Sequence, residues 1–353
     1  MDSDETRVRL ADLGVGPGAF LRGPRNAITD VPGVLVGHAT VHTGRLHTGV
    51  TAVVPEQLGA ARRWLPAGLA VGNGYGKLVG ATQIQELGAI ETPILLTSTL
   101  SVYRVADALL GHMLARPGYE ETTTLNPVVG ETNDGFLSDI RSRPLGEPEV
   151  EAALAAASAG PVEEGSVGAG AGTVALGFKG GIGTSSRSVP VGDGRYTVGA
   201  VVQTNFSGTL SIAGVGMPAS ELVPGPIAET VGNSCMIVVA TDAPLDSRQL
   251  ARCARRAVYA MRGAGADFAQ GSGDYAIAFS VGEGRVPDDA ALSPLFLATM
   301  DAVEESIVNS ILAATTQVHD DGRVAHAIPI AAVRQRLAAA GIGSAGPTTA
   351  PTR

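Results

Sequence analysis

A chain of 353 residues, of which 44% are hydrophobic and 17% charged, can bury a large core, either as one large domain or as two. Its net charge of −9 argues against the basic surface that nucleic-acid-binding proteins use, so we expect no nucleic-acid partner. The 47 glycines and the aromatic content of only 4% predict many tight turns and close approaches between packed layers of backbone.

The first half of the chain is predicted to begin with strands. Residues 28–55 alternate β-branched residues with turn signals, which is typical of two or three short strands joined by hairpins. We then expect a short helix at 83–87, a strand at 93–99, a helix at 102–118 and an Ala-rich helix from Glu147 that ends before 165. The segment NPVVGETNDGFLSDI, residues 126–140, is dense in Asn, Asp and Gly and is predicted to be an exposed loop.

The second half alternates between strands and helices. We expect strands at 196–204, 235–245 and 275–281, an amphipathic helix at 247–262 and a last helix at 301–315. The segment ELVPGPIAETVG, residues 221–232, contains two prolines and is predicted to be an irregular linker. The whole pattern favours an α+β fold with a largely antiparallel sheet core.

Three features bear on where the protein works. The acidic, polar start MDSDETRVRLADLG lacks a basic stretch followed by an apolar run, so no secretory signal is expected. No apolar run is long enough to cross a bilayer, so no membrane partner is expected. The only two cysteines, Cys235 and Cys253, are interpreted as buried free thiols, which fits a reducing compartment. We therefore expect a cytoplasmic protein whose residues 341–353 form a disordered tail.

The sharpest local feature is VGNSCMIVVATDAPL, in which Asn233 precedes Ser234 at the start of an apolar strand. In N-terminal-nucleophile hydrolases, the residue at such a position attacks the preceding carbonyl, shifts the peptide to an ester and is released by water with a free α-amino group. That amine titrates near about 7.7 to 8.0, so part of it is a base at neutral pH. Because Asn-Ser before a strand is also an ordinary turn, these residues alone leave both interpretations open.

Two segments resemble binding motifs without completing them. The Gly-rich run from Gly165 to Gly183 lacks both phosphate-loop patterns, and Lys179 precedes its glycines instead of following them. Close packing of strands is the better interpretation of these glycines. Three histidines, His38, His42 and His47, are close in sequence, but no cysteine or acidic cluster completes a metal site. We expect neither a metal nor a cofactor.

Six ordered blocks resemble the DmpA-type family of aminopeptidases, which includes L-aminopeptidase/D-Ala-esterase/amidases and β-peptidyl aminopeptidases. The blocks are ITDVPGVLVGHAT with HTGVTAVVP, NPVVGETNDGFLSD, GAGTVALGFKGGIGTSSR, VVQTNFSG, GNSCMIVVATDAPL and GSGDYAIAFS. The resemblance implies a four-layer α/β/β/α sandwich, as in DmpA and the ornithine acetyltransferases, with the nucleophile at a strand start between two sheets. It also implies one peptidase domain, self-cleaved into an α-chain of residues 1–233 and a β-chain of 234–353, and a homo-oligomer of such pairs.

The resemblance assigns the catalytic residues. Ser234 matches the family nucleophile, and Asn233 holds the carbonyl that is attacked. Ser272 and Asp274 match a serine and a carboxylate, often Glu in the family, that relay and orient a proton near the nucleophile. Asn205 in QTNFSG matches the asparagine whose side-chain amide donates to the oxyanion.

Two further residues are expected to bind the substrate. Glu131 in VVGETNDG matches the carboxylate that holds the free amino group of the substrate, which explains exopeptidase behaviour. Phe136 is close to it in sequence and is a candidate for lining the pocket. The predicted substrates are small peptides, amides or esters.

Two alternatives share this fold. The enzyme could pass the acyl group to an amine, as ornithine acetyltransferases do, or attack oligoamides, as nylon-oligomer hydrolases do. Both of those relatives use Thr as nucleophile, so a serine at 234 favours the peptidase. The other alternative is an inactive binding protein, which would remain a single intact chain.

Overall fold

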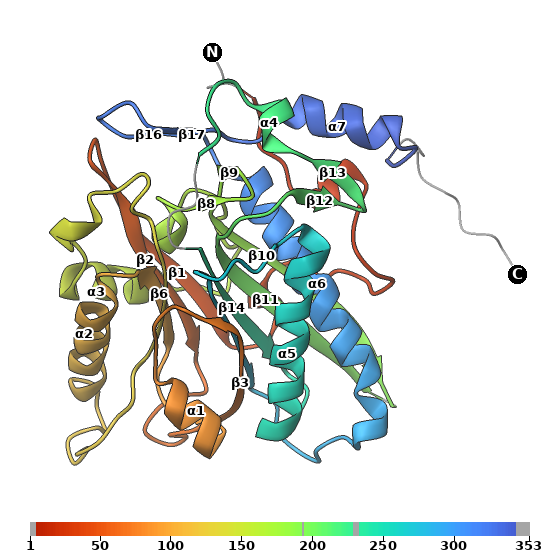
Figure 1. Cartoon of the computed structure of the whole chain (residues 1–353). Coiled ribbons are helices and arrows are strands. Elements are labelled where there is room, and N and C mark those ends of the chain that lie inside the picture. Colours follow the sequence, from red (N-terminus) through yellow and green to blue (C-terminus); the bar gives the residue numbers. More distant parts are fainter. Residues whose placement is uncertain (1–4, 193, 229–232, 344–353) are drawn as a thin grey trace, which may run out of the picture.

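Two β-sheets lie face to face and carry helices on both outer surfaces (Figure 1). The structure is a computed structural model that describes residues 5–192, 194–228 and 233–343. Its layers are a pair of helices, a five-stranded sheet, a six-stranded sheet and a second pair of helices. The predicted α/β/β/α sandwich is therefore confirmed.

The five-stranded sheet joins segments from the first 132 residues. Its strands, in spatial order, are β1 (Val34–Thr43), β2 (Leu46–Pro55), β6 (Ile94–Ser98), β7 (Val128–Thr132) and β4 (Leu78–Val79). β1 and β2 form the predicted hairpin, and only β6 and β7 are parallel. The sheet is thus largely antiparallel, as the alternation in the sequence predicts.

The prediction of an exposed loop at 126–140 is wrong for its first half. Residues 128–132 form β7, and all five of them are buried. The segment starts with two valines, and its carboxylate at Glu131 accepts a backbone hydrogen bond from Lys77, which offsets the cost of burying it. The polar composition of the segment favoured a loop, because the sequence does not show which hydrogen-bond partners its polar side chains have in the folded protein.

The six-stranded sheet contains the strands that position the candidate site. In spatial order they are β10 (Ile182–Val191), β11 (Gly194–Asn205), β14 (Ser234–Thr241), β15 (Gly273–Ser280), β3 (Leu65–Gly74) and β5 (Ala89–Ile90). β14 and β15 are parallel and completely buried, and the other pairs are antiparallel. A strand buried on both faces needs a continuous apolar run, and the sequence after Ser234 supplies one.

Helices cover each outer face of the sandwich. α5 (Ser247–Ala264) and α6 (Ser293–Leu312) pack on the six-stranded sheet, and α2 (Val102–Leu114) and α3 (Glu147–Ala155) pack on the five-stranded sheet. The remaining helices are α1 (Ala81–Leu87), α4 (Ala219–Leu222) and α7 (Ile330–Ala339), with the short 3-10 helices η1 (Leu10–Leu13), η2 (Ile28–Asp30), η3 (Ile140–Ser142), η4 (Gly168–Gly170) and η5 (Asp289–Ala291). No helix in the described ranges is long and apolar enough to cross a bilayer.

Three small hairpins complete the fold. They pair β8 (Val174–Ala175) with β9 (Phe178–Lys179), β12 (Leu210–Ile212) with β13 (Val215–Met217), and β16 (Gln317–Val318) with β17 (Val324–Ala325). A turn over residues 341–343 follows α7, and Ile342 donates a backbone hydrogen bond to Leu337 there. The rest of the predicted tail, 344–353, lies outside the described residues.

The hydrophobic core is divided among the gaps between these layers. On β14, Met236 and Val238 face the five-stranded sheet, whereas Ile237 and Val239 face α5 and α6. This alternation follows from the two-residue period of a strand. The Gly-rich segment lets the layers approach closely: a Cβ atom at Gly183 would stand 2.6 Å from a backbone nitrogen of α6. Packing therefore explains that glycine better than phosphate binding does.

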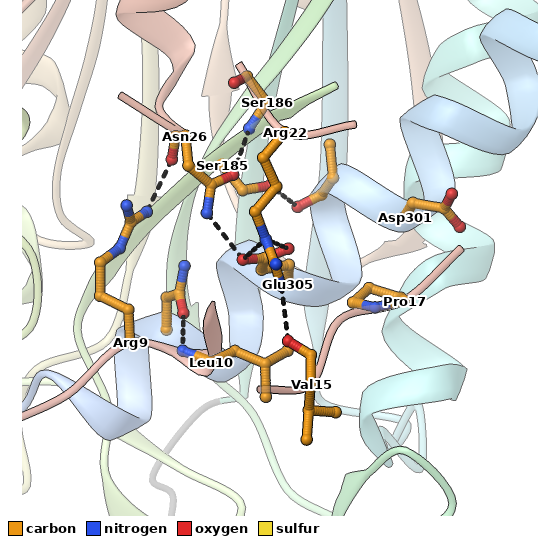
Figure 2. Close-up of polar contacts among 12 residues, drawn as sticks. Arg9, Leu10, Val15, Pro17, Arg22, Asn26, Ser185, Ser186, Asp301 and Glu305 are labelled. Atoms are coloured by element: carbon orange, nitrogen blue, oxygen red, sulfur yellow. Dashed lines mark hydrogen bonds and ion pairs between the residues drawn. The ribbon is translucent and has the colours of Figure 1, made fainter. Parts of the chain in front are cut away.

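A buried ion cluster ties the N-terminal segment to α6. Arg22 and Asn26 both donate to the carboxylate of Glu305, at 2.9 Å and 2.7 Å (Figure 2). Arg187 on β10 donates to the same carboxylate at 2.6 Å, and neither Arg187 nor Glu305 is more than 1% exposed. Such charges are stable in the interior only when each is paired and hydrogen-bonded. Residues on both sides of the 233–234 bond are thus held together by a shared charge network.

Candidate active site

The site is built where β11, β14 and β15 meet. Ser234 begins β14, and its register partners are Asn205 at the end of β11 and Gly273 at the start of β15. Ser234 is only 4% exposed. The sheet register therefore brings together three blocks that are up to 68 residues apart in the sequence, VVQTNFSG, GNSC and GSGDY.

The carbonyl oxygen of Asn233, at the bond to Ser234, accepts two hydrogen bonds. The Ser234 hydroxyl lies 2.6 Å from the carbonyl oxygen of Asn233, to which it donates a hydrogen bond. The backbone N–H of Gly273 donates to the same oxygen at 2.8 Å. An N–H already aimed at a carbonyl oxygen stabilises the negative charge that develops there during nucleophilic attack. The hydroxyl and the donor are thus both in place at one carbonyl group.

Ser272 and Asp274 form the second part of the site. The Ser272 hydroxyl donates to Asp274 Oδ1 at 2.7 Å, so the aspartate is long enough to reach this serine. Both side chains are buried, and Asp274 Oδ2 has no hydrogen-bond partner among the described residues. Burial raises the pKa of Asp274 from 3.8 to about 6, and the bond from Ser272 opposes that rise.

The raised pKa of Asp274 predicts an acid limit to activity. Above pH 6 the carboxylate is charged and can orient the Ser272 hydroxyl, whereas below pH 6 it is protonated and loses that role. The α-amine of a cleaved Ser234 would itself be protonated below about pH 7.7 to 8.0, so we expect kcat to fall about tenfold per pH unit below that value and more steeply below pH 6, where Asp274 is protonated as well. A kcat–pH profile measures this, with Asp274→Glu expected to move the limit. A flat profile between pH 5 and 7 would contradict the assignment.

Asn205 is held with its amide in a defined orientation. Its Oδ1 accepts a hydrogen bond from the backbone N–H of Val174 at 3.0 Å. Since the carbonyl end of the amide is bound there, the donor end is turned away from Val174. Asn205 is 1% exposed and lies beside Ser234 in the sheet, which is where a side-chain donor to an oxyanion is needed.

Glu131 lies on the facing sheet, in β7, and a short segment after β3 separates it from Ser234. Its Oε1 accepts from the backbone N–H of Lys77 at 2.8 Å, and the Lys77 ammonium is 3.5 Å away. A Cβ atom at Gly76 would stand 3.1 Å from that carboxylate oxygen and 3.2 Å from the Cα of Gly273. Glu131 and Gly273, the first residue of β15, therefore lie on opposite sides of a single glycine.

Phe136 is farther from these groups than its position in the sequence implies. It is half-buried and packs against a small cluster of Leu137, Val174, Ala228 and Ala325. It also lines a hollow of about 710 Å³, whose other walls come from residues 224–227, 321–324 and 326. The guanidinium of Arg323 lies 5.8 Å from the ring centre. Phe136 is connected to the site through Val174, the residue that orients Asn205.

Two more charged side chains are buried near the site. Asp134 accepts hydrogen bonds from Thr48 and Ser98, and burial raises its pKa to about 6. The ammonium of Lys179 donates to the carbonyl oxygens of Gly170 and Gly180, each at 2.8 Å, and burial lowers its pKa to about 7. Lys179 thus joins two parts of the Gly-rich segment by hydrogen bonds, so its role is structural.

Several residues that the structure places beside the Asn233–Ser234 bond carry no functional signal of their own in the sequence. Gly273, Ser207 and Asp267 all contact Asn233 directly or through one intermediate. Gly273 and Ser207 lie inside the quoted blocks GSGDY and QTNFSG. The sequence shows that these residues lie in the blocks. It does not show which group their backbone N–H or hydroxyl contacts, and that contact defines their role.

Comparisons with known proteins show the family of the chain. The sequence pattern of peptidase family S58 matches residues 26–325. The β-peptidyl aminopeptidase BapA of Sphingosinicella xenopeptidilytica is 38% identical, over 91% of this chain and 89% of its own length. The structure of the PH0078 protein from Pyrococcus horikoshii OT3 is 41% identical with a TM-score of 0.88, over 95% of this chain and 100% of that one.

A third relative identifies the fold class. The L-aminopeptidase D-Ala-esterase/amidase from Ochrobactrum anthropi is described as a prototype for the serine aminopeptidases and as a variant of the Ntn hydrolase fold. It is 35% identical with a TM-score of 0.87, over 94% of this chain and 99% of that one. The chain therefore belongs to peptidase family S58, and it is a serine aminopeptidase with the Ntn hydrolase fold.

Proposed function

We propose that the chain cuts itself between Asn233 and Ser234 and then uses Ser234 to release N-terminal residues from small peptides, amides or esters. One observation carries this proposal: the Ser234 hydroxyl lies 2.6 Å from the carbonyl oxygen of the preceding residue, which also accepts from Gly273 N–H. The Gly273 N–H bond is a rung of the parallel β14–β15 ladder, so the sheet itself holds a donor at that carbonyl. The donor is what an attack on that carbonyl requires.

Self-cleavage supplies the base that hydrolysis needs. Once Ser234 is N-terminal, its α-amino group takes the proton of its own hydroxyl as that hydroxyl attacks the substrate carbonyl. Ser272 and Asp274 orient the amine, and Asn205 donates to the oxyanion. The acyl group is then carried on Ser234 until water releases it. No step in this sequence calls for a metal or another cofactor.

Glu131 accounts for attack at the N-terminus of a peptide only. A buried carboxylate on the far side of Gly76 attracts the ammonium of a substrate and disfavours an internal peptide carbonyl. Phe136 remains a candidate for lining the substrate pocket, because it packs against the cluster that contains Val174, the residue that orients Asn205. We include β-aminoacyl substrates, because the relative BapA is named for β-peptides.

The two fragments are expected to remain one domain after the cut. β14 and β15, from the predicted β-chain, lie between β11 and β3, from the predicted α-chain, in one continuous sheet. The Glu305 cluster adds a buried ionic link between the same two fragments. We further propose a homo-oligomer, since large side chains such as Tyr75 and Leu21 are 73% exposed. A cytoplasmic location fits the two free, buried thiols, Cys235 and Cys253.

Free-amine recognition can be tested with Glu131→Gln. We expect kcat/KM for β-alanyl and L-alanyl p-nitroanilides to fall about 10- to 100-fold, because a charge-assisted hydrogen bond contributes about 1.5 to 3 kcal/mol. N-acetylated versions of the same anilides, which lack the ammonium, are the matched control and should be poor substrates of both enzymes. Equal hydrolysis of free and acetylated anilides by the wild type would refute the aminopeptidase assignment of Glu131.

A further inference from the structure

The side chain of Asn233 is itself held in place, at the residue that the proposed cut leaves behind. Its Nδ2 donates to the hydroxyl of Ser207 at 2.6 Å. The Ser207 hydroxyl in turn donates to the carboxylate of Asp267, at 2.8 Å from Oδ1 and 2.9 Å from Oδ2. These three side chains, which we call the Asn233 clamp, come from three different segments of the chain.

The direction of each hydrogen bond in the clamp follows from its donors. A charged carboxylate only accepts, so the single proton of Ser207 is committed to Asp267. The Ser207 oxygen can then only accept from Asn233, which fixes the amide nitrogen, and not the amide oxygen, toward Ser207. The hydrogen bond from Ser207 to the Asp267 carboxylate is charge-assisted, and such a bond is stronger than one between neutral groups.

Asp267 belongs to the same loop that contacts the scissile carbonyl. Its backbone N–H donates to the carbonyl of Ser207 at 3.3 Å, and its Oδ1 accepts from the backbone N–H of Ala269 at 3.1 Å. The loop continues through Ser272, whose N–H donates to the carbonyl of Ala269, to Gly273 at the start of β15. Residues 267–273 therefore contact Asn233 at two points. Asp267 is linked to its side chain through Ser207, and Gly273 donates to its backbone carbonyl.

We propose that Ser207 and Asp267 are positioning residues for self-cleavage, which hold Asn233 so that its carbonyl faces both the Ser234 hydroxyl and the Gly273 N–H. This inference rests on the proposed self-cleavage. In that step a bond forms between Ser234 Oγ and the carbonyl carbon of Asn233, the peptide C–N bond breaks, and the hydroxyl proton ends on the freed nitrogen. Water then splits the ester: its oxygen joins the carboxyl group of Asn233, and a proton returns to Ser234 Oγ.

The clamp acts on the departing residue, which separates its role from catalysis on substrates. After the cut, Asn233 is no longer bonded to Ser234, so the clamp has nothing further to position. Variants of the clamp should thus slow processing without lowering the turnover of enzyme that has been processed. Ser207→Ala is the cleaner variant, because the charge of Asp267 also contributes, after burial, to the raised pKa of Asp274.

The test follows the rate of self-cleavage in full-length chains made by in vitro translation and sampled over time by intact mass spectrometry. We expect Ser207→Ala to slow the cut about 10- to 100-fold, since a small misplacement of reacting groups has an effect of that order. Asp267→Asn should also slow it, whereas Ser207→Thr keeps the hydroxyl and should cut within about threefold of the wild type. The kcat of the processed fraction of Ser207→Ala should equal that of the wild type.

A second background tests whether Ser207 acts through the side chain of Asn233. In Asn233→Gly the clamp has nothing to hold, so adding Ser207→Ala should change the rate of cutting less than twofold. Cutting by Ser207→Ala at the wild-type rate overturns the inference, as does an equal loss of processing and of kcat, which would indicate general disruption of the site. If the wild type never cuts, the proposed self-cleavage itself is refuted. If the wild type and Ser207→Ala both cut at the same rate, only the role of the clamp is refuted.

Discussion

Ser234→Ala is expected to remain one intact chain of 353 residues and to hydrolyse no substrate, whereas the wild type gives fragments of residues 1–233 and 234–353. The variant lacks the oxygen that lies 2.6 Å from the Asn233 carbonyl oxygen, so neither the cut nor the later acyl-enzyme can form. The expected loss of kcat is at least about 10⁴-fold, as for removal of a nucleophile in other serine hydrolases. Intact-protein mass spectrometry and an anilide assay measure both effects.

Two control variants make the Ser234→Ala result specific. Ser185→Ala removes another fully buried hydroxyl, one that bonds the carbonyl of Ala302 on α6, and it should still cut and hydrolyse. Ser234→Thr keeps a hydroxyl at the site and should retain slow cutting. A wild type that stays whole after long incubation would favour the inactive scaffold, and cutting of Ser234→Ala at the same bond would point to another nucleophile or to a contaminating protease.

Asn205→Ala is expected to lower kcat by about 10²- to 10³-fold with little change in KM. A donor to an oxyanion stabilises charge that exists in the transition state and is nearly absent from the bound substrate, so its removal acts on kcat. The hydrogen bond from Val174 N–H fixes the orientation of the amide, with its donor end turned away from Val174. Steady-state kinetics on fully processed protein measures the effect.

The isosteric variant Asn205→Asp distinguishes donation from packing. It preserves the shape of the side chain but replaces the donor by an acceptor, so it should lose as much activity as Asn205→Ala. Asn126→Ala, which changes an exposed asparagine bonded to Glu91, is the matched control and should leave kcat unchanged. If Asn205→Asp kept wild-type kcat, the oxyanion role of Asn205 would be wrong and its function would be structural.

Local sequence patterns predicted most of the elements of this fold. The strand after Ser234, the amphipathic helix α5 and the helix α2 each follow from an apolar run or a helical period within one short segment, because those signals depend on neighbours in the chain. The same reasoning misplaced β7. Polar residues at 131 and 132 lowered its apparent hydrophobicity, and only their partners in space, Lys77 for Glu131 and Gln203 for Thr132, show why they are buried.

For the candidate site too, one part can be predicted from the sequence and another part requires the folded structure. The chemical groups can be read from the sequence alone. The residues that supply them all lie in blocks that resemble one family: Ser234, Asn205, Ser272, Asp274 and Glu131. Only the tertiary structure decided which groups meet: the Gly273 N–H at the Asn233 carbonyl, Asp267 behind Ser207, and Glu131 across Gly76. The register between β11, β14 and β15 is set by packing over the whole sheet, and a shift of β14 by one residue would turn the Ser234 side chain to the other face and away from these partners.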